Sequence, residues 1–311
     1  MRKIKKETFV SEKIELLNSA INGVGMFAKT KVYQEEIVWI KGGYILKTSE
    51  IFTSGVINSY LLISDDIAIG AYTEKDEEKI KAYCNHSCNP NSRVQGNIVF
   101  VASKDIEVDK EILVDYAFID NENYRFKCNC KASNCRKIIT GFDWQLKKLQ
   151  QMYKKEYFSS YIQSKINLGI SVDFKCQLDK QIKDLREKVF VNELNFDIQD
   201  EFQGNEEKFI HCCLYKNDEL IAYARVDVED EYARIGRILV KKEERGNGYG
   251  KQIIFWAETE ALKNNKSNII VHSIESALSF YENQEYNFLE KKLIEDGQSH
   301  FLMGKHLDLN N

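Results

Sequence analysis

The sequence predicts a two-domain protein in which a β-rich first half is followed by an α/β second half. Three observations carry this prediction. At 311 residues, the chain is long for one hydrophobic core and comfortable for two. Charge divides unevenly, because residues 1–167 carry 25 Lys and Arg against 21 Asp and Glu, whereas residues 168–311 carry 19 against 27. The hydrophobic pattern also changes, from short strand-like runs to alternating helices and strands.

The first half contains short β-type runs broken by Gly, Asn and Asp, which predict a compact, strand-rich domain. These runs are EEIVWI, GGYILK, YLLISDDIAIG and NIVFVASKDI. One helix should follow in DWQLKKLQQMYKKEYFSSYI, because its apolar residues recur at helical spacing and form a single stripe. That stripe consists of Leu146, Leu149, Tyr153, Tyr157 and Tyr161. We place the domain boundary after residue 167, so that residues 1–167 and 168–311 form the two domains.

The second half begins with a helix in QLDKQIKDLREKVFVNEL. A hairpin follows, with strands KFIHCCLY and LIAYARVDV joined by the turn KNDE, and then a strand in RIGRILVKK. A glycine-rich turn opens the next helix, GKQIIFWAETEALKN. This order predicts a mixed β-sheet with helices on both faces.

Composition excludes several classes of protein. Hydrophobic residues make up 43% and charged residues 30%, and no apolar run reaches the length of a membrane span. The basic start MRKIKKETFV leads into no apolar segment of the kind found in signal peptides. We therefore expect a cytoplasmic protein with no membrane partner. The uneven charge of the two halves argues against sequence-independent nucleic-acid binding by the chain as a whole, and we expect no direct nucleic-acid binding.

The cysteines predict a metal site. In a reduced protein, a local cluster of cysteines more often indicates a metal than a disulfide. Cys128, Cys130 and Cys135 place three thiols in eight residues, and zinc requires four ligands. Cys88 is the natural fourth ligand, because Pro90 stiffens its loop. The alternative is a loop of free cysteines. The remaining four should be buried as small apolar residues: Cys84, Cys176, Cys212 and Cys213.

Four motifs in order resemble the SET family of protein-lysine methyltransferases. They are GVGMFA from Gly23, NHSCNPN from Asn85, EILVDY from Glu111 and CNCKASNC from Cys128. The resemblance covers roughly half of the chain and implies a β-rich SET fold with a post-SET zinc cluster. In this family the Asn-His-Ser-Cys and Asp-Tyr segments form a pseudoknot beside the cofactor. It also takes the fourth zinc thiolate from the position of Cys88.

The resemblance implies an S-adenosylmethionine site. Gly23, Val24 and Gly25 should let the backbone approach the cofactor closely. Asn85 and His86 should hold its amino-acid and adenine ends, and the Tyr116 hydroxyl should lie beside the transferring methyl group. Aromatic side chains suit a cationic lysine and a sulfonium, and three residues could supply them: Tyr83, which we also assign to the cofactor, Phe118 and Tyr124.

Two residues depart from the common SET pattern. Val114 stands where many members place Phe or Tyr just before Asp-Tyr, and Lys137 replaces a glycine common after the last cysteine. The first position touches the lysine channel in the family. The degree of lysine methylation therefore does not follow from the resemblance.

A second motif, RGNGYG, lies between a strand and a helix. A glycine-rich turn at a helix start presents free N–H groups and the positive end of the helix dipole, which suits a pyrophosphate. The GxGxxG spacing of dinucleotide-binding folds is absent. The segment and its flanks resemble the acyl-CoA loop of the GNAT family of N-acetyltransferases, in particular its small ElaA-type branch. The loop residues are Arg245, Gly246, Asn247, Gly248, Tyr249 and Gly250.

The GNAT resemblance implies an acetyl-CoA site in the second half. The cofactor thioester should lie along a splayed strand that includes Ile238 and Val240. Tyr281 should protonate the leaving thiolate, and His300 or Glu295 could take the proton of the acceptor amine. The alternative for His300 is a structural histidine at a strand end.

The sequence thus predicts an S-adenosylmethionine-dependent protein-lysine N-methyltransferase fused to an acetyl-CoA-dependent N-acetyltransferase, with Zn²⁺ in the first half. Its expected partner is a lysine in a protein or peptide. Two alternatives stay open. One half could be a cofactor-sensing or substrate-recruiting module without turnover, or the protein could be a zinc-stapled interaction protein with two inactive pockets.

Overall fold

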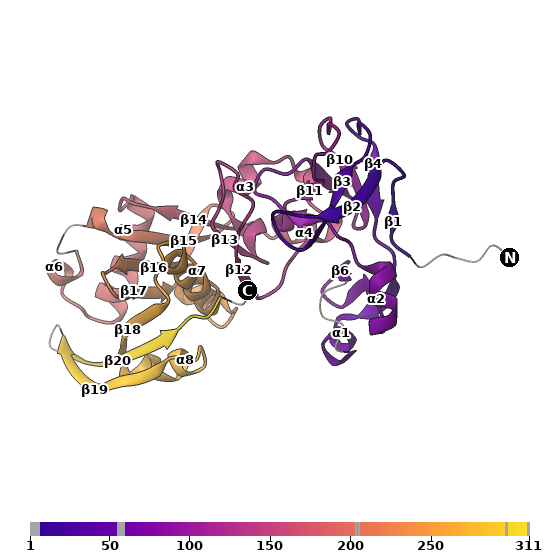
Figure 1. Ribbon diagram of the computed structural model, residues 1–311. Coiled ribbons are helices and arrows are strands. Elements are labelled where there is room, and N and C mark those ends of the chain that lie inside the picture. The colour runs from indigo at the N-terminus through magenta and orange to yellow at the C-terminus, as the bar shows by residue number, and fades with distance from the viewer. Residues whose placement is uncertain (1–6, 55–59, 203, 205, 296–297, 310–311) are drawn as a thin grey trace. The chain divides into compact units, whose positions relative to one another are not determined.

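The chain forms two compact units, Met1–Asn167 and Leu168–Asn311 (Figure 1). The computed structural model describes residues 7–54, 60–202, 204, 206–295 and 298–309. Within these ranges no helix is both long enough and apolar enough to cross a membrane.

The first unit is built from short strands in small sheets. A four-stranded sheet has the order β1 (Phe9–Val10), β4 (Ile37–Ile40), β10 (Val99–Ala102) and β9 (Ser92–Gln95). A three-stranded sheet has the order β5 (Tyr44–Lys47), β7 (Ile67–Gly70) and β6 (Tyr60–Leu62). Three strand pairs complete the unit: β2 (Ile14–Asn18) with β3 (Val24–Ala28), β8 (Asn85–His86) with β11 (Leu113–Val114), and β12 (Arg125–Lys127) with β13 (Ile138–Thr140).

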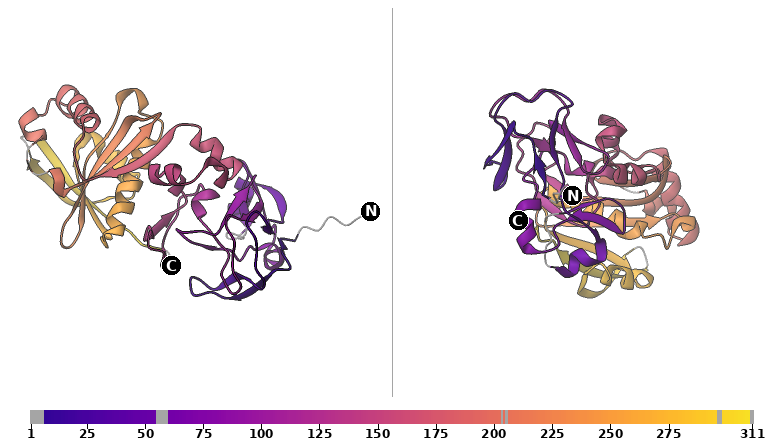
Figure 2. Two further views of the ribbon diagram at one scale, coloured as in Figure 1. Left: turned by 90° about the horizontal axis from the view of Figure 1, so that it is seen from above. Right: turned by 90° about the vertical axis from the view of Figure 1, so that its right-hand side faces the viewer.

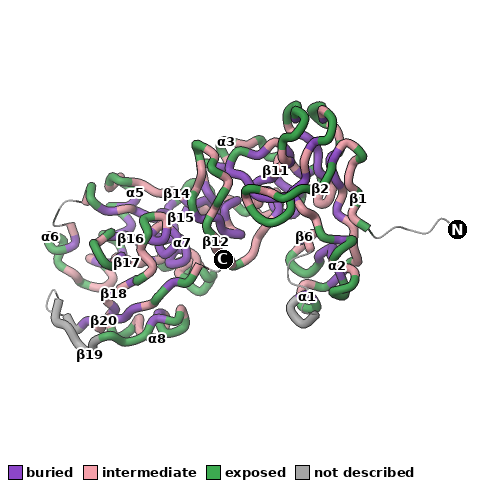
Figure 3. Tube along the Cα trace, viewed as in Figure 1, coloured by how far each residue is buried: buried purple, intermediate pink, exposed green. Residues whose placement is uncertain are grey.

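Apolar residues of these strands form the core of the first unit (Figure 3). Trp39 of β4 lies opposite Phe100 of β10, and their rings stack with centroids 3.6 Å apart. Both side chains are almost fully buried, as is Met26 of β3. The predicted β-rich first half therefore follows from short strands, several of which bury large apolar side chains.

The helices of the first unit are short. They are α1 (Thr48–Ser54), α2 (Glu74–Ile80), α3 (Lys147–Met152) and α4 (Ser160–Ile166), with 3₁₀ turns at Tyr116–Phe118, Asp143–Gln145 and Lys155–Tyr157. The prediction of one continuous helix after the cysteines is wrong. Tyr153 and Phe158 have extended backbone, and Ser159 caps a new helix by accepting a hydrogen bond from the Ile162 N–H.

The break in this helix has a packing reason. The Ser159 N–H donates to the Phe118 carbonyl at 2.7 Å, which fixes the chain against the 3₁₀ turn. Tyr153, Tyr157 and Phe158 then pack edge-on around the Phe118 ring, with centroids 4.9 to 5.7 Å away. Aromatic packing around one buried ring outweighs the helical periodicity of the segment.

The second unit is a seven-stranded mixed sheet with helices on both faces (Figure 2). The strand order is β14 (Ile170–Lys175), β15 (Ile210–Lys216), β16 (Glu219–Val228), β17 (Ala233–Val240), β18 (Asn268–Ile274), β20 (Gln298–His306) and β19 (Asn287–Glu295). All neighbours are antiparallel except β17 and β18. The helices are α5 (Lys180–Arg186), which continues as a π-helix over Glu187–Glu193, α6 (Ile198–Glu201), α7 (Tyr249–Lys263) and α8 (Leu278–Glu282), with 3₁₀ turns at Glu206–Lys208, Lys242–Glu244 and Glu275–Ala277.

Local sequence accounts for the main turns of this sheet. Asn217 and Asp218 join β15 to β16 with φ of 51° and 62°, as a tight hairpin turn of the type favoured by Asn and Asp requires. The face of α7 that includes Ile253, Trp256 and Ala257 is fully buried, which anchors the helix to the sheet. The predicted order of two domains, with a mixed sheet in the second, is confirmed.

Candidate functional sites

The glycine segment of the first unit forms the turn and second strand of a hairpin. Gly23 adopts φ of 49°, and its carbonyl accepts a hydrogen bond from the Ser19 N–H at 2.7 Å. A Cβ at Gly25 would lie 2.2 Å from the Glu111 Oε1, so no other residue fits there without displacing that carboxylate. Val24 is exposed between the two glycines. At Gly25 the backbone of this segment therefore lies directly beside the Glu111 carboxylate, with no side chain between them.

Asn85 ties this hairpin to the pseudoknot. Its amide Nδ2 donates to the Glu111 Oε1 at 2.8 Å and approaches the carbonyls of Asn22 and Val24 at 3.1 and 3.4 Å. The Ser19 hydroxyl donates to the other Glu111 oxygen at 2.9 Å. Sequence reasoning named Asn85 but missed Glu111, although this acid begins the EILVDY motif. Glu111 thus orients both Asn85 and the glycine turn.

Two segments far apart in the sequence thread together around Asn91. Strands β8 and β11 pair in parallel, with Asn85 opposite Leu113 and His86 opposite Val114. The Asn91 side chain donates to the Glu111 carbonyl at 2.7 Å and accepts from the Leu113 N–H at 2.8 Å. These bonds satisfy backbone groups that a two-residue ladder leaves unpaired. They explain why the stretch NHSCNPN is so polar.

Tyr116 lies at the end of this pairing, in contact with His86. The Tyr116 N–H donates to the His86 Nδ1 at 3.2 Å, and the Tyr116 hydroxyl donates to the Cys84 carbonyl at 3.2 Å. The two rings meet edge to face with centroids 5.2 Å apart. Burial raises the pKa of the Tyr116 hydroxyl, which keeps the hydroxyl protonated and able to donate. Tyr83 is half-buried against the same core, and the Lys81 Nζ lies 5.7 Å from its ring centroid.

An aromatic and acidic lining surrounds Tyr116. The Phe126 ring lies 6.1 Å from the Tyr116 ring and 5.9 Å from the Tyr124 ring, and the Tyr124 hydroxyl donates to the Asp120 carboxylate. Burial raises the pKa of the Asp120 carboxyl to about 7. The prediction for Phe118 is wrong, because its side chain is fully buried in the core, and Phe126 takes the place beside Tyr116.

The four predicted zinc cysteines come together. The sulfur atoms of Cys88, Cys128, Cys130 and Cys135 all lie within 4.8 Å of one another. Hydrogen bonds lower the pKa of the Cys88 thiol to about 3, chiefly from the Cys128 thiol and also from His86 and the Arg136 N–H. Four thiols at this spacing fit the tetrahedral set that a structural zinc requires.

The other four cysteines divide. Cys84, Cys212 and Cys213 are buried, as expected of small apolar residues. Cys176 is exposed, so the prediction for it is wrong. It follows the end of β14, where the chain leaves the sheet for a turn.

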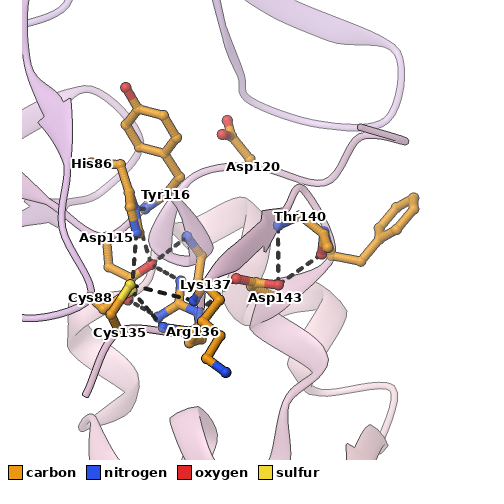
Figure 4. Close-up of polar contacts among 12 residues, drawn as sticks. His86, Cys88, Asp115, Tyr116, Asp120, Cys135, Arg136, Lys137, Thr140 and Asp143 are labelled. Carbon is orange, nitrogen blue, oxygen red and sulfur yellow. Dashed lines mark hydrogen bonds and ion pairs between the residues drawn. The ribbon is translucent and has the colours of Figure 1, made fainter. Parts of the chain in front are cut away.

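Arg136 connects the cysteine cluster to Tyr116 (Figure 4). It follows Cys135 directly and donates two hydrogen bonds of 2.7 Å to Asp115, which precedes Tyr116. Its Nε also contacts Asp143 at 2.7 Å. Both acids are at most 1% exposed, so this network is a buried structural link. Sequence reasoning missed Arg136, although its place beside a metal ligand was a signal.

The glycine-rich loop of the second unit forms an open start to α7. Gly246 and Gly248 both have φ of 81°, and Gly248 is the N-cap residue. A Cβ at either position would meet nothing within 4 Å, so the space above the loop is open. Arg245 contacts Glu193 at 2.8 Å, and Asn247 donates to the Glu244 carbonyl at 3.2 Å. Tyr249 starts the helix, and Gly250 packs against Phe280.

The strand before this loop separates from its neighbour. Strands β17 and β18 pair only over Ala233–Ile235 and Ile269–Val271. At Gly236 the register with β16 shifts, and Arg237 adopts φ of 52°. Ile238 and Val240 lie beyond this irregularity, and both are half-buried. This opening is where the predicted thioester would lie.

The predicted proton-transfer residues occupy different parts of the second unit. Tyr281 lies in α8, and burial raises the pKa of its hydroxyl. Within the described part of the chain no hydrogen bond to this hydroxyl is found, and the Tyr281 side chain is 7% exposed. His300 lies near the start of β20, opposite Ile274 of β18, and is 8% exposed. Glu295 lies in β19, and its side chain falls outside the described part of the chain.

The comparisons with known proteins match a different protein family in each half of the chain. Residues 23–117 match the family model of the SET domain, and residues 179–307 match that of the acetyltransferase (GNAT) domain. The chain is 30% identical over 131 residues to the uncharacterized N-acetyltransferase YjcF of Bacillus subtilis, covering 41% of this chain and 94% of that protein.

The first half has a relative of a different kind. The chain is 30% identical over 152 residues to human histone-lysine N-methyltransferase 2B, covering 44% of this chain but only 6% of that protein.

Among solved structures, Escherichia coli ElaA is 26% identical, with a TM-score of 0.36, and the match covers 44% of this chain and 99% of that one. The chain therefore carries a SET domain and belongs, through its second half, to the GNAT acetyltransferase family.

Proposed function

We propose that the first half transfers a methyl group from S-adenosylmethionine to a lysine of a protein, and that the second half transfers an acetyl group from acetyl-CoA to an amine. The observation that carries the first proposal is the convergence of Gly25, Asn85 and Tyr116 on one pseudoknot. A site without turnover would have no chemical need for all three.

The residues of the first half fit the cofactor. The absence of side chains at Gly23 and Gly25 permits a close approach to the backbone, and the Asn85 side chain is oriented by the Glu111 carboxylate. S-adenosylmethionine supplies an electrophilic methyl group on a sulfonium sulfur. The protein must hold the lysine nitrogen in line with it and remove water and one proton.

The lining beside Tyr116 suits a cationic substrate. Phe126 and Tyr124 present ring faces and edges, and the Asp120 and Glu122 carboxylates lie on the same loop. Rings and carboxylates attract an alkylammonium group. We assign this lining to the entering lysine and the cysteine cluster to Zn²⁺, which would staple the loop that carries Arg136.

The second half fits a pyrophosphate at its loop. The first turn of α7 offers backbone N–H groups, the helix dipole is positive there, and the glycines leave the space open. Acetyl-CoA supplies an activated thioester. The opening between β17 and β18 gives the thioester a place, and the Tyr281 hydroxyl can donate a proton to a leaving thiolate.

Methyl transfer is tested by incubating the full chain with radiolabelled S-adenosylmethionine and bulk protein. Removing the hydroxyl in Tyr116→Phe should lower the rate about 100-fold while cofactor binding persists, because a positioned hydroxyl acts mainly on the transition state. Tyr157→Phe is the control, since it removes a tyrosine hydroxyl from the 3₁₀ turn at Lys155–Tyr157. Equal rates for the two variants would refute the assignment of Tyr116, and an absence of labelled protein with the unaltered chain would refute methyl transfer.

A further inference from the structure

A charged hollow lies where β17 bends away from its neighbours in the second unit. Its lining includes three arginines, one acid and two histidines from β16, β17, β18 and β20, namely Arg225, Arg234, Arg237, Asp227, His272 and His300. The hollow includes the predicted base His300 and adjoins the opening at Gly236. The roles proposed for the glycine-rich loop and for the β17 segment at Ile238 and Val240 do not explain why guanidinium groups gather here.

The register of the sheet brings these groups to one face. Arg225 lies opposite Gly236 and Asp227 lies opposite Arg234, so all four share a face because side chains alternate along a strand. Gly236 has no side chain, which leaves room in front of Arg225. Arg237 is added to the same hollow by its positive φ of 52°, a conformation that is strained for a non-glycine residue.

Buried acids hold two of the arginines in place from behind. Arg237 contacts Glu201 at 2.7 Å, and Arg225 contacts Glu206 at 2.9 Å. Arg186 of α5 contacts both acids, at 2.6 and 3.0 Å, and its side chain is fully buried together with that of Glu201. The arginines are therefore fixed before any ligand arrives, which reduces the entropy that binding must overcome.

The hollow keeps a positive balance after this pairing. Four guanidinium groups face three carboxylates, since Arg234 pairs with Asp227 at 3.0 Å and the other three arginines share Glu201 and Glu206. Each lining arginine contacts its acid through one nitrogen, whereas a guanidinium has five N–H donors. N–H donors thus remain for a ligand with several acceptor oxygens.

We propose that this hollow binds the carboxylate or phosphate of a small amine, and that such an anionic amine is the acetyl acceptor of the second half. Paired guanidinium forks recognise planar or tetrahedral oxyanions better than any other side chain. The same positive charge disfavours the ammonium form of the nearby amine and so favours the neutral nucleophile. The identification of the acceptor rests on the proposed acetyl transfer.

The transfer is balanced as follows. The amine nitrogen forms a bond to the acetyl carbonyl carbon and loses one proton, for which His300 lies in the same hollow. The carbon–sulfur bond breaks, its electron pair stays with the sulfur, and the sulfur takes one proton from the Tyr281 hydroxyl, which balances the proton that the amine loses. No oxidant or other reactant is required.

The test compares matched pairs of amines by calorimetric titration of the full chain without acetyl-CoA. O-phosphoethanolamine is paired with ethanolamine, and β-alanine with propylamine, so that each pair differs in its anionic group. At least one anionic amine should bind about tenfold or more tightly than its partner. The two pairs, with inorganic phosphate as a third probe, distinguish a phosphate from a carboxylate.

Two variants place the effect in the hollow. Arg237→Gln and Arg225→Gln should each weaken binding of the anionic amine about tenfold or more, while Glu201 and Glu206 keep Arg186 as a partner. Lys188→Gln is the control, because it removes one positive charge from an exposed pair with Glu243. Acetyl-CoA titration of each variant checks that the unit is folded.

The outcomes separate this proposal from the proposed function. Equal affinity within both pairs, or unchanged affinity in both arginine variants, overturns the oxyanion site. So does a failure of every probe to bind a chain that binds acetyl-CoA. If acetyl-CoA does not bind the unaltered chain, acetyl transfer fails, and the amine titrations still decide whether the hollow binds oxyanions.

Discussion

Arg136 donates two parallel hydrogen bonds of 2.7 Å to Asp115, whose side chain is fully buried. Arg136 follows a cysteine of the cluster, and Asp115 precedes Tyr116. One ion pair therefore joins the cysteine loop to the residue that we assign to methyl transfer. Because the neighbouring positions are rigidly connected, a change in the loop should be felt at the tyrosine.

Breaking this pair on one side should be costly. Arg136→Met leaves Asp115 as a buried charge with its main partner gone, and such losses cost about 3–5 kcal/mol. Urea unfolding of the full chain measures the change. The double variant Arg136→Met with Asp115→Asn removes both charges of this pair and should lose less than the single variant, because Asp143 loses Arg136 in both. An equal loss in both would show that the unpaired Asp115 charge does not set the cost.

Zinc content tests the cysteine cluster directly. We expect about one zinc per chain by elemental analysis, because four cysteine ligands make a closed structural site. Cys88→Ser should lose most of the metal, and a chelator should lower the melting temperature of the unaltered chain. Cys176→Ser, a change at an exposed cysteine outside the cluster, should keep its zinc. Zinc that persists in Cys88→Ser would contradict the assignment.

The partly buried carboxyl of Asp120 should make stability depend on pH. Its pKa rises from an ordinary 3.8 to about 7 because burial disfavours the charge. Between these values the folded state binds a proton that the unfolded state has lost, so stability falls as the pH rises through this window. Asp120→Asn removes this loss and should gain stability over the unaltered chain from pH 5 to pH 8.

Unfolding midpoints in urea at several pH values measure this effect. The amide of Asp120→Asn can still accept the hydrogen bond from Tyr124, so packing changes little. Asp66→Asn, at an exposed position, serves as the control. A difference that is constant with pH would show that Asp120 does not titrate in this range.

Acetyl-CoA binding at the loop before α7 can be tested with two substitutions of Gly248 that have the same size but differ in charge. Acetyl-CoA at a hundredfold excess over its dissociation constant should stabilise the chain by about 2.7 kcal/mol. Gly248→Asp should abolish this shift, because a carboxylate repels the pyrophosphate. Gly248→Asn has the same size and tolerates positive φ, so it should keep part of the shift. If the two variants respond alike, crowding rather than charge explains the loss.

The sequence supports the prediction of local elements better than that of links between distant segments. The glycines and the cysteines could be found by spacing, and the hairpin at Asn217 by its turn chemistry. The helix after the cysteines was mispredicted because periodicity does not register the aromatic cluster around Phe118. Local pattern cannot show that a distant ring will capture part of a helix.

The same limit explains the residues that were missed. Glu111 and Arg136 act through partners 26 and 21 positions away, so their roles appear only when the chain is folded. The arginines at 225 and 237 stand among mostly apolar residues in YARVDV and IGRILV, which is a signal that sequence reasoning could have used. A charge at a strand's buried face needs a partner, and here that partner is a pair of acids before β15.

The parallel pairing of β8 with β11 has a consequence for biosynthesis. The two residues of β8 pair with a segment 28 positions later, and the arrangement is closed only by Arg136, which lies 21 positions after its partner Asp115. Contacts of such long sequence separation form slowly, because loop closure must precede them. As the ribosome releases the chain, we expect the β2–β3 hairpin to form first and the proposed methyl-transfer site to remain unformed until Cys135 and Arg136 have emerged.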